Sequence, residues 1–368
     1  MRSRLSQLKS LTLFLFVFIS GCAGSIKNPP VSEGVKPVLC CDSDYQHDLQ
    51  IQYLGVGGFS IRRGKDAILT APFFSNPSIL RVGLWSIQSD PKQIDTFFPA
   101  AEDVSAILVG HAHYDHLMDI PHIAQKHTPH AQIYGSETMK NILAAVLPQE
   151  RLTALNTVAA TDKQTGKWQD IEGTRIRIMA IKSEHAPHFC LFGRRLCLKL
   201  YQGKVTQPQS RLPRTAWGWK EGQTLAYLID FMAEDKKSID FRIHYQDAAS
   251  NPPRGFPPVF VDPGNKKRVD VTILCVPGFN EVENYPEALI QKMRPRFVVL
   301  AHWESFFRPR TGDPKDLKVV PGGTEPNVFL NRLPQATQWR MPQPGAWLRF
   351  KAEQSSMNEQ MQENVASN

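Results

Sequence analysis

Cysteine is scarce in this sequence, with six residues in 368. That number is too small for the dense disulfide framework on which small secreted domains depend. No internal apolar run reaches the roughly 18 residues of a membrane helix. Repeats of fixed period are also missing, which excludes a solenoid. Hydrophobic residues make up 42% and charged residues 21% of the chain, so it is neither a disordered nor a coiled-coil protein. A globular protein with a sizeable core remains.

The N-terminus has the pattern of an export signal. Arg2, Arg4 and Lys9 precede a short apolar stretch, residues 11–19, which ends at Ser20-Gly21-Cys22. A basic start, a short apolar segment and small residues are the three parts of a secretory signal, here residues 1–21. Cys22 after Ile-Ser-Gly resembles the lipobox of bacterial lipoproteins, in which the cysteine is lipidated. A simple signal peptide with a chance cysteine is the alternative.

The sequence also predicts the location of the protein and the nature of the segments on either side of the globular part. The two residues after Cys22 are Ala23 and Gly24. Neither is the aspartate that would resemble an inner-membrane retention signal, so we expect an outer-membrane lipoprotein that faces the periplasm. Residues 22–47 are rich in Pro, Gly and Ser and are typical of a tether. Residues 351–368 are polar and predict a disordered tail.

The charge argues against nucleic acid as a partner. The formal net charge is +8. Loss of a signal with three basic residues and no acidic one would leave +5, which is too mildly basic to indicate a nucleic-acid-binding surface. We therefore expect a small-molecule or lipid substrate and membrane contact through the lipid. The sequence leaves the oligomeric state open.

Short apolar segments predict a layered α/β domain over residues 48–350. The first strands form a meander, and later strands alternate with helices. Ser136 is a candidate N-cap for a helix that runs to about Val146, and Trp347–Phe350 is a candidate for the strand that closes the last sheet. The predicted strands are 49–54, 59–62, 67–70, 105–109, 131–134, 175–181, 225–229, 241–245, 271–276 and 297–301, and the other predicted helices are 119–126 and 286–292.

A cluster of histidines follows one apolar strand, residues 105–109. Gly110-His111-Ala112-His113-Tyr114-Asp115-His116 places three imidazoles and one carboxylate within six residues. Imidazole and carboxylate are ligands of zinc and similar metals, and loops that follow buried strands are where sites collect. The motif therefore predicts a metal centre.

This motif resembles the central metal motif of the metallo-β-lactamase superfamily, whose fold is a four-layer αββα sandwich. The likeness runs from about Leu49 to Phe350 and includes the opening segments Leu54–Phe59 and Ile68–Phe74. Within the superfamily it is nearest to the branch of N-acylphosphatidylethanolamine phospholipase D and ascorbate-6-phosphate lactonase. That resemblance implies three further ligands, each after a strand, which match His185, Asp247 and His302.

The resulting ligand set can hold two divalent ions. His111, His113 and His185 would bind one, and the other would be bound by Asp115, His116 and His302, with Asp247 as a bridge. Two ions about 3.5–4 Å apart hold a hydroxide between them, which can attack phosphorus or a carbonyl carbon. Asp115 and Asp247 are thus the candidate catalytic residues. Zinc comes first, with manganese and iron as alternatives.

Some neighbouring residues compete for these roles. His188 lies three residues after His185, and we favour His185 because it is nearer the strand end. His244 precedes Asp247 on its strand, where alternation predicts packing rather than ligation. Asp270 is a candidate to orient a ligand histidine, with strand-end solvation as the alternative. Two positions depart from the family pattern, because Ala71-Pro72 replaces Asp-Pro and Val56 stands where a histidine is common.

A basic and aromatic stretch follows the predicted ligand His185. Residues 189–220 contain seven basic and no acidic residues, and Trp217 and Trp219 resemble an aromatic element of the phospholipase-like branch. The candidate substrate-binding residues are Arg194, Arg195, Trp217 and Trp219. The stretch is either a flap for an anionic, partly apolar substrate or a solvated basic hairpin. Cys190 and Cys197 can close a hairpin by a disulfide or remain two thiols.

The sequence thus favours an envelope-anchored dinuclear metal hydrolase acting on a phosphodiester, with a phospholipid as one such substrate. A bridging aspartate, rather than a cysteine, favours diesters or lactones over redox chemistry. Two alternatives remain: a lactonase or other carbonyl hydrolase with the same metals, and an envelope lipoprotein without catalysis.

Overall fold

The computed structural model describes residues 46–191, 196–259, 267–320 and 325–352. The predicted signal (1–21), most of the tether, Cys22, Arg194, Arg195 and nearly all of the predicted tail lie outside the described residues. In the described part, no helix has the length and apolar character needed to cross a bilayer.

The first sheet has seven strands in the order β16-β1-β2-β3-β4-β5-β6. The four strands from β16 to β3 pair antiparallel, and those from β3 to β6 pair parallel. The predicted meander at its start is confirmed. The bounds are β1 Leu49–Gly55, β2 Gly58–Arg63, β3 Asp66–Thr70, β4 Val104–Leu108, β5 Gln132–Gly135, β6 Leu152–Ala154 and β16 Trp347–Phe350.

The second sheet also has seven strands, in the order β15-β14-β13-β12-β11-β8-β7. It repeats the pattern of the first, because β7, β8, β11 and β12 pair antiparallel whereas β12 to β15 pair parallel. The bounds are β7 Gln169–Asp170, β8 Ile176–Lys182, β11 Leu225–Met232, β12 Ile239–Gln246, β13 Val271–Cys275, β14 Phe297–Ala301 and β15 Gln338–Arg340.

The prediction that Trp347–Phe350 closes the last sheet is wrong. This strand, β16, pairs antiparallel with β1 of the first sheet, with Leu49 opposite Phe350. The edge of the second sheet is already covered by β15. Leu348 and Phe350 are buried in the core, and the Phe350 ring lies 4.9 Å from that of Phe297. The last strand therefore protects the free edge of β1 and joins the two sheets.

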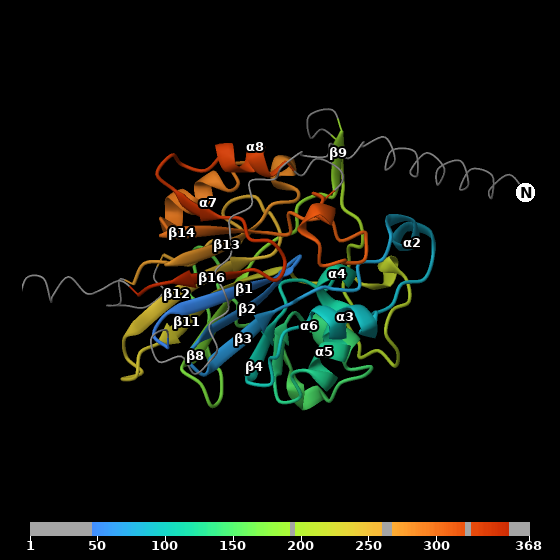
Figure 1. Ribbon diagram of the computed structural model, residues 1–368, viewed down its shortest axis with the longest axis horizontal. Coiled ribbons are helices and arrows are strands. Elements are labelled where there is room, and N and C mark those ends of the chain that lie inside the picture. Colours follow the sequence, from blue (N-terminus) through green and yellow to red (C-terminus); the bar gives the residue numbers. More distant parts are fainter. Residues whose placement is uncertain (1–45, 192–195, 260–266, 321–324, 353–368) are drawn as a thin grey trace, which may run out of the picture.

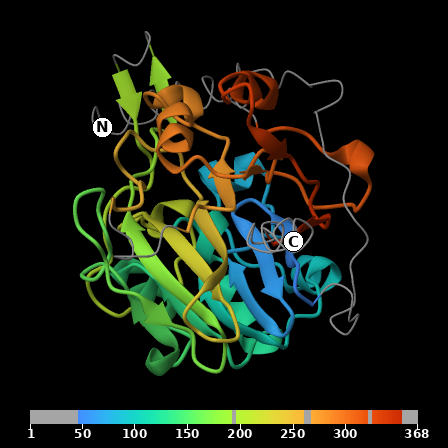
Figure 2. The ribbon, with the colours of Figure 1, turned by 90° about the vertical axis from the view of Figure 1, so that its left-hand side faces the viewer.

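Helices cover the outer faces of both sheets, and the chain forms four layers (Figures 1 and 2). Helices α3 to α6 lie against the first sheet, and α7 and α8 lie on the side of the second. The bounds are α2 Ile79–Leu84, α3 Pro91–Phe97, α4 Tyr114–Leu117, α5 Ile120–Lys126, α6 Glu137–Leu143, α7 Glu287–Met293 and α8 Pro326–Asn331. The three predicted helices correspond to α5, α6 and α7.

Helix α6 begins as predicted and ends early. The Ser136 hydroxyl accepts a hydrogen bond from the Met139 amide, which is an N-cap contact. The helix ends at Leu143 instead of Val146. Pro148 lies just beyond, and the residue before a proline avoids the helical conformation.

Two clusters of buried side chains hold the layers together. One lies between the sheets and extends to the helices over the second sheet, with Tyr53, Ile178, Tyr227 and Phe329 among its members. The other lies between the first sheet and helices α3 to α6 and includes Ile107. With helices outside and two sheets inside, the predicted αββα sandwich is confirmed.

Candidate metal centre

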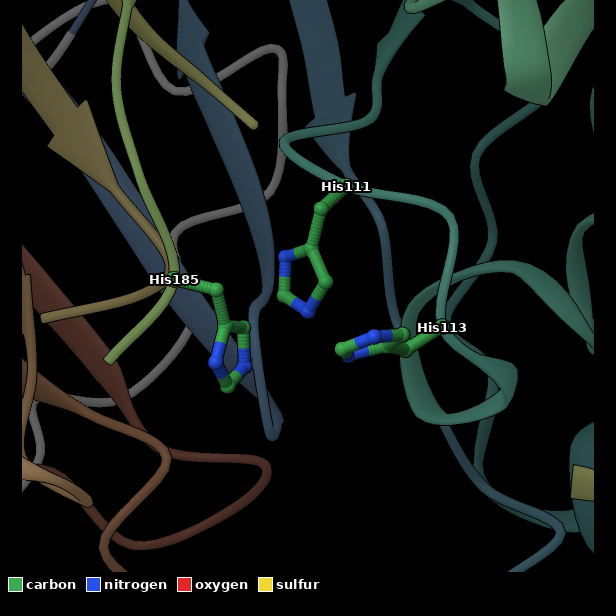
Figure 3. Close-up of side chains that lie close together, drawn as sticks. All are labelled: His111, His113 and His185. Carbon is green, nitrogen blue, oxygen red and sulfur yellow. The ribbon is translucent and has the colours of Figure 1, made fainter. Parts of the chain in front are cut away.

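The predicted ligands come together where strands of the two sheets end. His111 follows β4, His185 follows β8, Asp247 follows β12 and His302 follows β14. Parallel strands place their carboxyl ends at one edge of a sheet, which is where α/β proteins collect their sites. Figure 3 shows the rings of His111, His113 and His185 facing a common point from separate segments. The topology thus unites residues that lie almost 200 positions apart.

The seven side chains form overlapping groups of possible ligands. His111, His113 and His185 make one group, Asp115, His116 and His302 a second, and His111, His116 and Asp247 connect the two; within each group the ligand atoms lie within 4.8 Å of one another. The first two groups have the membership expected from the sequence. The third brings Asp247 to a residue of each of the other two groups, His111 and His116.

Asp247 lies between two imidazoles. Its Oδ1 is 3.1 Å from His111 Nδ1, and its Oδ2 is 3.3 Å from His116 Nδ1. On the opposite side, Asp115 Oδ2 is 3.3 Å from His302 Nε2. The two carboxylates therefore approach the imidazoles from different sides, and both are buried. Each oxygen of Asp247 faces a different half of the site.

Several nitrogens of the cluster are buried without a hydrogen bond. Within the described residues, His111 Nε2, His113 Nε2 and His302 Nδ1 have no hydrogen-bond partner. Leaving a buried polar atom unsatisfied costs about 1–3 kcal/mol. A metal ion would occupy such lone pairs, so the donor set fits divalent ions with nitrogen and oxygen ligands. The site therefore has the chemistry of a metal centre.

Burial favours the neutral form of three of the histidines, His111, His113 and His185. It lowers the pKa of His111 to about 4, with a further contribution from the charge of His116, and it lowers the pKa values of His113 and His185 as well. Neutral imidazole is the form that binds a metal. His185 Nδ1 lies 2.6 Å from the carbonyl oxygen of Ala186, to which it can donate its proton. Its Nε2 is then left for the cluster.

The two aspartates remain ionised. Burial alone would raise their pKa values, but the charges of His116 and His302 act on Asp115, and those of His111 and His116 act on Asp247. Both pKa values end well below the usual range. Burial lowers the pKa of His116, yet the two carboxylates outweigh this effect and raise it. The two carboxylates can therefore bind a cation.

His188 lies beside the cluster and outside its ligand groups. Its ring stacks on that of His185, with centroids 4.7 Å apart and planes 14° apart. Its Nδ1 accepts a hydrogen bond of 3.2 Å from the Leu200 amide. This placement agrees with the preference for His185 as the ligand.

Sequence reasoning missed the buried group that supports His302. The Tyr53 hydroxyl accepts a hydrogen bond of 2.9 Å from the His302 amide and donates one to Glu304. Glu304 also accepts from the Val56 amide, at 2.7 Å. His302 and Val56 both have positive φ angles, 62° and 55°, which are strained for side chains of this size. The Tyr53–Glu304 pair therefore fixes two strained residues beside the site.

Asp119 binds the segment that follows Ala71-Pro72, where the family pattern has Asp-Pro. Its carboxylate accepts hydrogen bonds from the amides of Phe74 and Ser75, at 2.7 and 2.9 Å, and from the Ser75 hydroxyl. It thus holds the segment that follows Ala71-Pro72. Asp119 is fully buried and makes no N-cap contact with α5, so its role is to tie this loop to the helix layer.

Other polar candidates lie away from the cluster. His244 is buried and bonded to Thr272 and Gly255, which confirms packing rather than ligation. Asp270 contacts no ligand histidine, because it pairs with Lys267 and Arg296 at the opposite end of β13. The half-exposed pair His122 and His127 contacts Asp95, and His130 is exposed.

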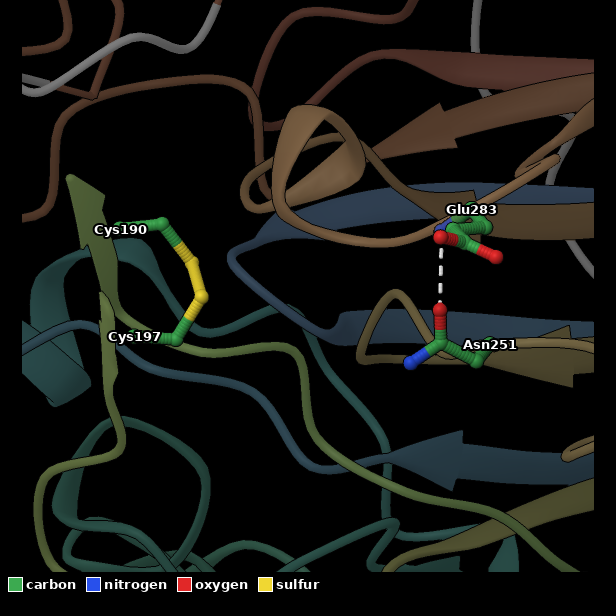
Figure 4. The surroundings of a disulfide bond; sticks show 4 residues. All are labelled: Cys190, Cys197, Asn251 and Glu283. Carbon is green, nitrogen blue, oxygen red and sulfur yellow. Dashed lines mark hydrogen bonds between the residues drawn. A yellow bond between two sulfur atoms is a disulfide. The ribbon is translucent and has the colours of Figure 1, made fainter. Parts of the chain in front are cut away.

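A disulfide-closed hairpin lies beyond the histidines. Strands β9 (Phe189–Leu191) and β10 (Leu196–Leu198) pair antiparallel, with Cys190 opposite Cys197 and their sulfurs bonded (Figure 4). Of the two possibilities for these cysteines, the structure has the disulfide. The hairpin forms a separate two-stranded sheet.

Aromatic rings connect the cluster to the surface. The Tyr201 ring lies 5.7 Å from that of His113 and 5.0 Å from that of Trp217. Trp217 belongs to the short helix η3 (Ala216–Gly218) and is 52% exposed. Trp219 is only 1% exposed and packs in the core between the first sheet and its helices. Trp217 is therefore the one of the two candidate tryptophans that a substrate could reach directly.

One part of the sequence matches a known family, and several solved structures are distantly similar to the chain. Residues 68–196 match the family model described as "Beta-lactamase superfamily domain". No curated protein matches this sequence. Similar solved structures include Igni18, a metallo hydrolase from the archaeon Ignicoccus hospitalis KIN4/I, with 14% identity over 83% of this chain and 100% of that chain and a TM-score of 0.49.

Two further structures illustrate the range of such likenesses. The metallo-β-lactamase fold protein YhfI from Bacillus subtilis has 11% identity over 82% of this chain and 99% of its own, with a TM-score of 0.44. CmlA, a diiron β-hydroxylase from Streptomyces venezuelae, has 10% identity over 83% of this chain and 54% of its own, with a TM-score of 0.43. Likeness this distant says nothing about the reaction, which has to be argued from the site. The family match and the two mixed sheets between helices give this chain the metallo-β-lactamase fold.

Proposed function

We propose that this protein is a hydrolase that depends on two divalent metal ions. Zinc is the preferred candidate for both ions, and manganese and iron are the alternatives. The observation that carries the proposal is the position of Asp247 between His111 and His116, at the junction of the two ligand groups. One ion would be held by His111, His113 and His185, the other by Asp115, His116 and His302, and Asp247 would contact both. When bound, such a pair supplies a water of lowered pKa and stabilises negative charge on the substrate.

The chain's own residues prepare the site for that chemistry. Burial lowers the pKa values of His111, His113 and His185, and the neighbouring imidazoles lower the pKa values of Asp115 and Asp247. The Ala186 carbonyl fixes the ring of His185, and the Tyr53 hydroxyl fixes the backbone of His302. Because the ligands are held in place before substrate arrives, little reorganisation is needed during the reaction.

The substrate we propose is a phosphodiester, and specifically a phospholipid. Residues 186–220 follow the cluster and contain seven basic residues and no acidic one. Arg194, Arg195 and Trp217 of this stretch are the groups proposed to contact the substrate. Guanidinium groups favour phosphate, and the exposed Trp217 ring favours an apolar neighbour. A neutral lactone would gain little from these charges.

The proposed location is the outer membrane on its periplasmic side, with lipidated Cys22 as anchor. The Cys190–Cys197 disulfide supports export, because disulfides persist in oxidising compartments. The test is metabolic labelling with radioactive palmitate, compared with the Cys22→Ala variant. Label that remains on the variant, or fails to appear on the parent chain, would contradict the anchor.

Metal content and turnover test the hydrolase. We expect about two metal ions per chain in the protein, and fewer in Asp247→Ala. The parent should hydrolyse bis-p-nitrophenyl phosphate, and the variant should have lost this activity. Asp235→Ala is the matched control, because Asp235 is exposed in the turn before β12 whereas Asp247 follows that strand. The control should retain both metals and activity.

Two outcomes would overturn parts of this proposal. Hydrolysis of lactones without any turnover of the diester, at every metal loading, would replace the phosphodiesterase by a carbonyl hydrolase. A chain that binds no metal and cleaves neither substrate would leave an envelope lipoprotein without catalysis.

A further inference from the structure

Helix α2 exposes its apolar residues to solvent. Leu80, Leu84 and Trp85 are 48%, 44% and 58% exposed, whereas Val82 alone of this helix is buried. Leu80 and Leu84 are four residues apart and so lie on one face. A helix that only packed on the domain would direct such residues inward. The exposed face of α2 is therefore suited to contact something other than water.

The segment that carries Trp217 lies beside the end of α2. The Ile87 amide, just after α2, donates a hydrogen bond of 2.8 Å to the Arg214 carbonyl, so the segment that carries Trp217 lies beside α2. Figure 1 shows α2 at the right-hand margin of the molecule, whereas the hairpin strand β9 projects from the top. Ala216 and Trp219 are buried and anchor the segment, while Trp217 is turned outward. Leu80, Leu84, Trp85 and Trp217 are called the α2 patch below.

The surroundings of the α2 patch are basic. Residues 67–89 and 186–220, which carry it, contain no aspartate or glutamate. Arg81, Lys204, Arg211 and Arg214 are exposed within these two segments. Exposed Trp and Leu bordered by Arg and Lys are the composition of surfaces that lie in the interface of an anionic bilayer.

We propose that the α2 patch docks the domain on an anionic phospholipid bilayer and presents the metal centre to the lipid. The consequence for catalysis rests on the function proposed above; the docking itself does not. The Trp217 ring contacts that of Tyr201, which in turn contacts that of His113, so two ring contacts connect the patch to the candidate ligands. A bilayer surface on the patch would bring lipid headgroups to the candidate ligands.

The N-terminal chain permits this orientation. The 24 residues from Cys22 to Tyr45 precede the described part. Fully extended, they would span at most about 80 Å. That reach exceeds the size of a domain. An anchor at Cys22 would therefore limit how far the domain can move from the membrane, but it would not determine which face of the domain points toward the membrane. The α2 patch would determine that face.

Tryptophan quenching by brominated lipid tests the docking. The sequence has no tryptophan before Trp85, so the N-terminal segment does not contribute to the signal. The full chain is bound to vesicles of dibromo-phosphatidylcholine with phosphatidylglycerol. We expect quenching of its tryptophan emission, and loss of most of that quenching in the variant Trp85→Phe/Trp217→Phe. The matched control Trp339→Phe/Trp347→Phe removes two half-buried rings of β15 and β16 and should quench like the parent.

A separate comparison tests whether docking requires anionic lipid. Vesicles without phosphatidylglycerol should quench less, and Arg81→Glu/Arg214→Glu should remove the difference between the two vesicle types. Equal quenching of the parent and the Trp85→Phe/Trp217→Phe variant, or bound parent chains that show no quenching, would overturn the proposal. Quenching that depends on the patch but not on anionic lipid would overturn its electrostatic part.

A kinetic experiment separates this inference from the proposed function. Leu80→Ser/Leu84→Ser alters only exposed side chains of α2. We expect unchanged turnover of bis-p-nitrophenyl phosphate and a reduced rate on phospholipid in vesicles. Equal rates on vesicles would contradict productive docking. Failure of the parent to cleave either substrate, together with normal quenching, would refute the hydrolase and leave the docking surface intact.

Discussion

The carboxylate of Asp247 lies directly against the backbone of Gly110. A Cβ atom built on Gly110 would stand 2.2 Å from both carboxylate oxygens. Such a contact does not occur between real side chains, so the carboxylate would have to move. The Gly110 carbonyl also accepts a hydrogen bond from the Leu225 amide, at 2.7 Å, which holds this backbone in place. The glycine at the head of the histidine motif thus makes room for the carboxylate of Asp247.

Gly110→Ala should therefore impair the metal centre although it replaces none of the candidate ligands. We expect the affinity for at least one metal to fall about 10–100-fold, the range found for residues that orient ligands, with diester hydrolysis reduced in parallel. Metal titration of the variant measures this. Gly83→Ala is the control, because a Cβ at Gly83 meets no atom within 4 Å. If Gly110→Ala binds metal as the parent does, Asp247 is not confined in this way.

Tyr53→Phe tests the group that supports His302. The variant deletes the hydroxyl that contacts the His302 amide and the buried Glu304 carboxylate. Loss of these partners should cost about 1–3 kcal/mol of unfolding free energy. Since His302 would no longer be held in its left-handed conformation, we also expect lower turnover at saturating metal. Denaturant unfolding and kinetics of the metal-loaded variant check the two effects; a variant with parental stability would refute the contact.

The histidine motif and the family resemblance predict which candidate ligands come together, but not the residues that support them. His111 is identified from the motif after an apolar strand, whereas Asp247 and His302 are implied by the resemblance, and the topology brings all three to one edge. Tyr53 and Glu304 are 251 positions apart and carry no shared pattern, so their contact exists only in the fold. The same holds for Trp347–Phe350, whose alternation predicted a strand but not its partner β1.

The Cys190–Cys197 bond should stabilise the hairpin and leave the rest of the fold unchanged. The β9–β10 pair is separate from both large sheets, and Cys197 is exposed. A bond between cysteines seven positions apart restricts a short loop, and the chain-entropy estimate of about 2–3 kcal/mol applies here to local opening of the hairpin rather than to unfolding of the domain. In Cys190→Ser/Cys197→Ser we expect faster hydrogen exchange in residues 189–198 and little change in the melting temperature. A large drop in melting temperature would show that the hairpin is part of the core.

His244 should make the protein less stable in mild acid. Its ring is fully buried, with Nδ1 3.0 Å from the Thr272 hydroxyl and Nε2 2.9 Å from the Gly255 carbonyl oxygen, and both contacts suit the neutral ring. Burial lowers its pKa to about 4, whereas an unfolded histidine titrates near 6.5. Between these values the unfolded chain binds the proton and the folded chain does not. The contribution of His244 is therefore complete above about pH 6.5 and is lost as the pH falls toward 4.

The comparison that isolates this effect is the pH dependence of unfolding in the parent and in His244→Gln, both loaded with metal. The parent's free energy of unfolding should fall more steeply with decreasing pH, by at most about 1.4 kcal/mol per pH unit for one proton. Above pH 7 the two curves should run parallel, because neither the folded nor the unfolded histidine takes up a proton there. Parallel curves down to pH 4 would mean that His244 is protonated in the folded protein, and that the contacts to Thr272 and Gly255 do not hold it neutral.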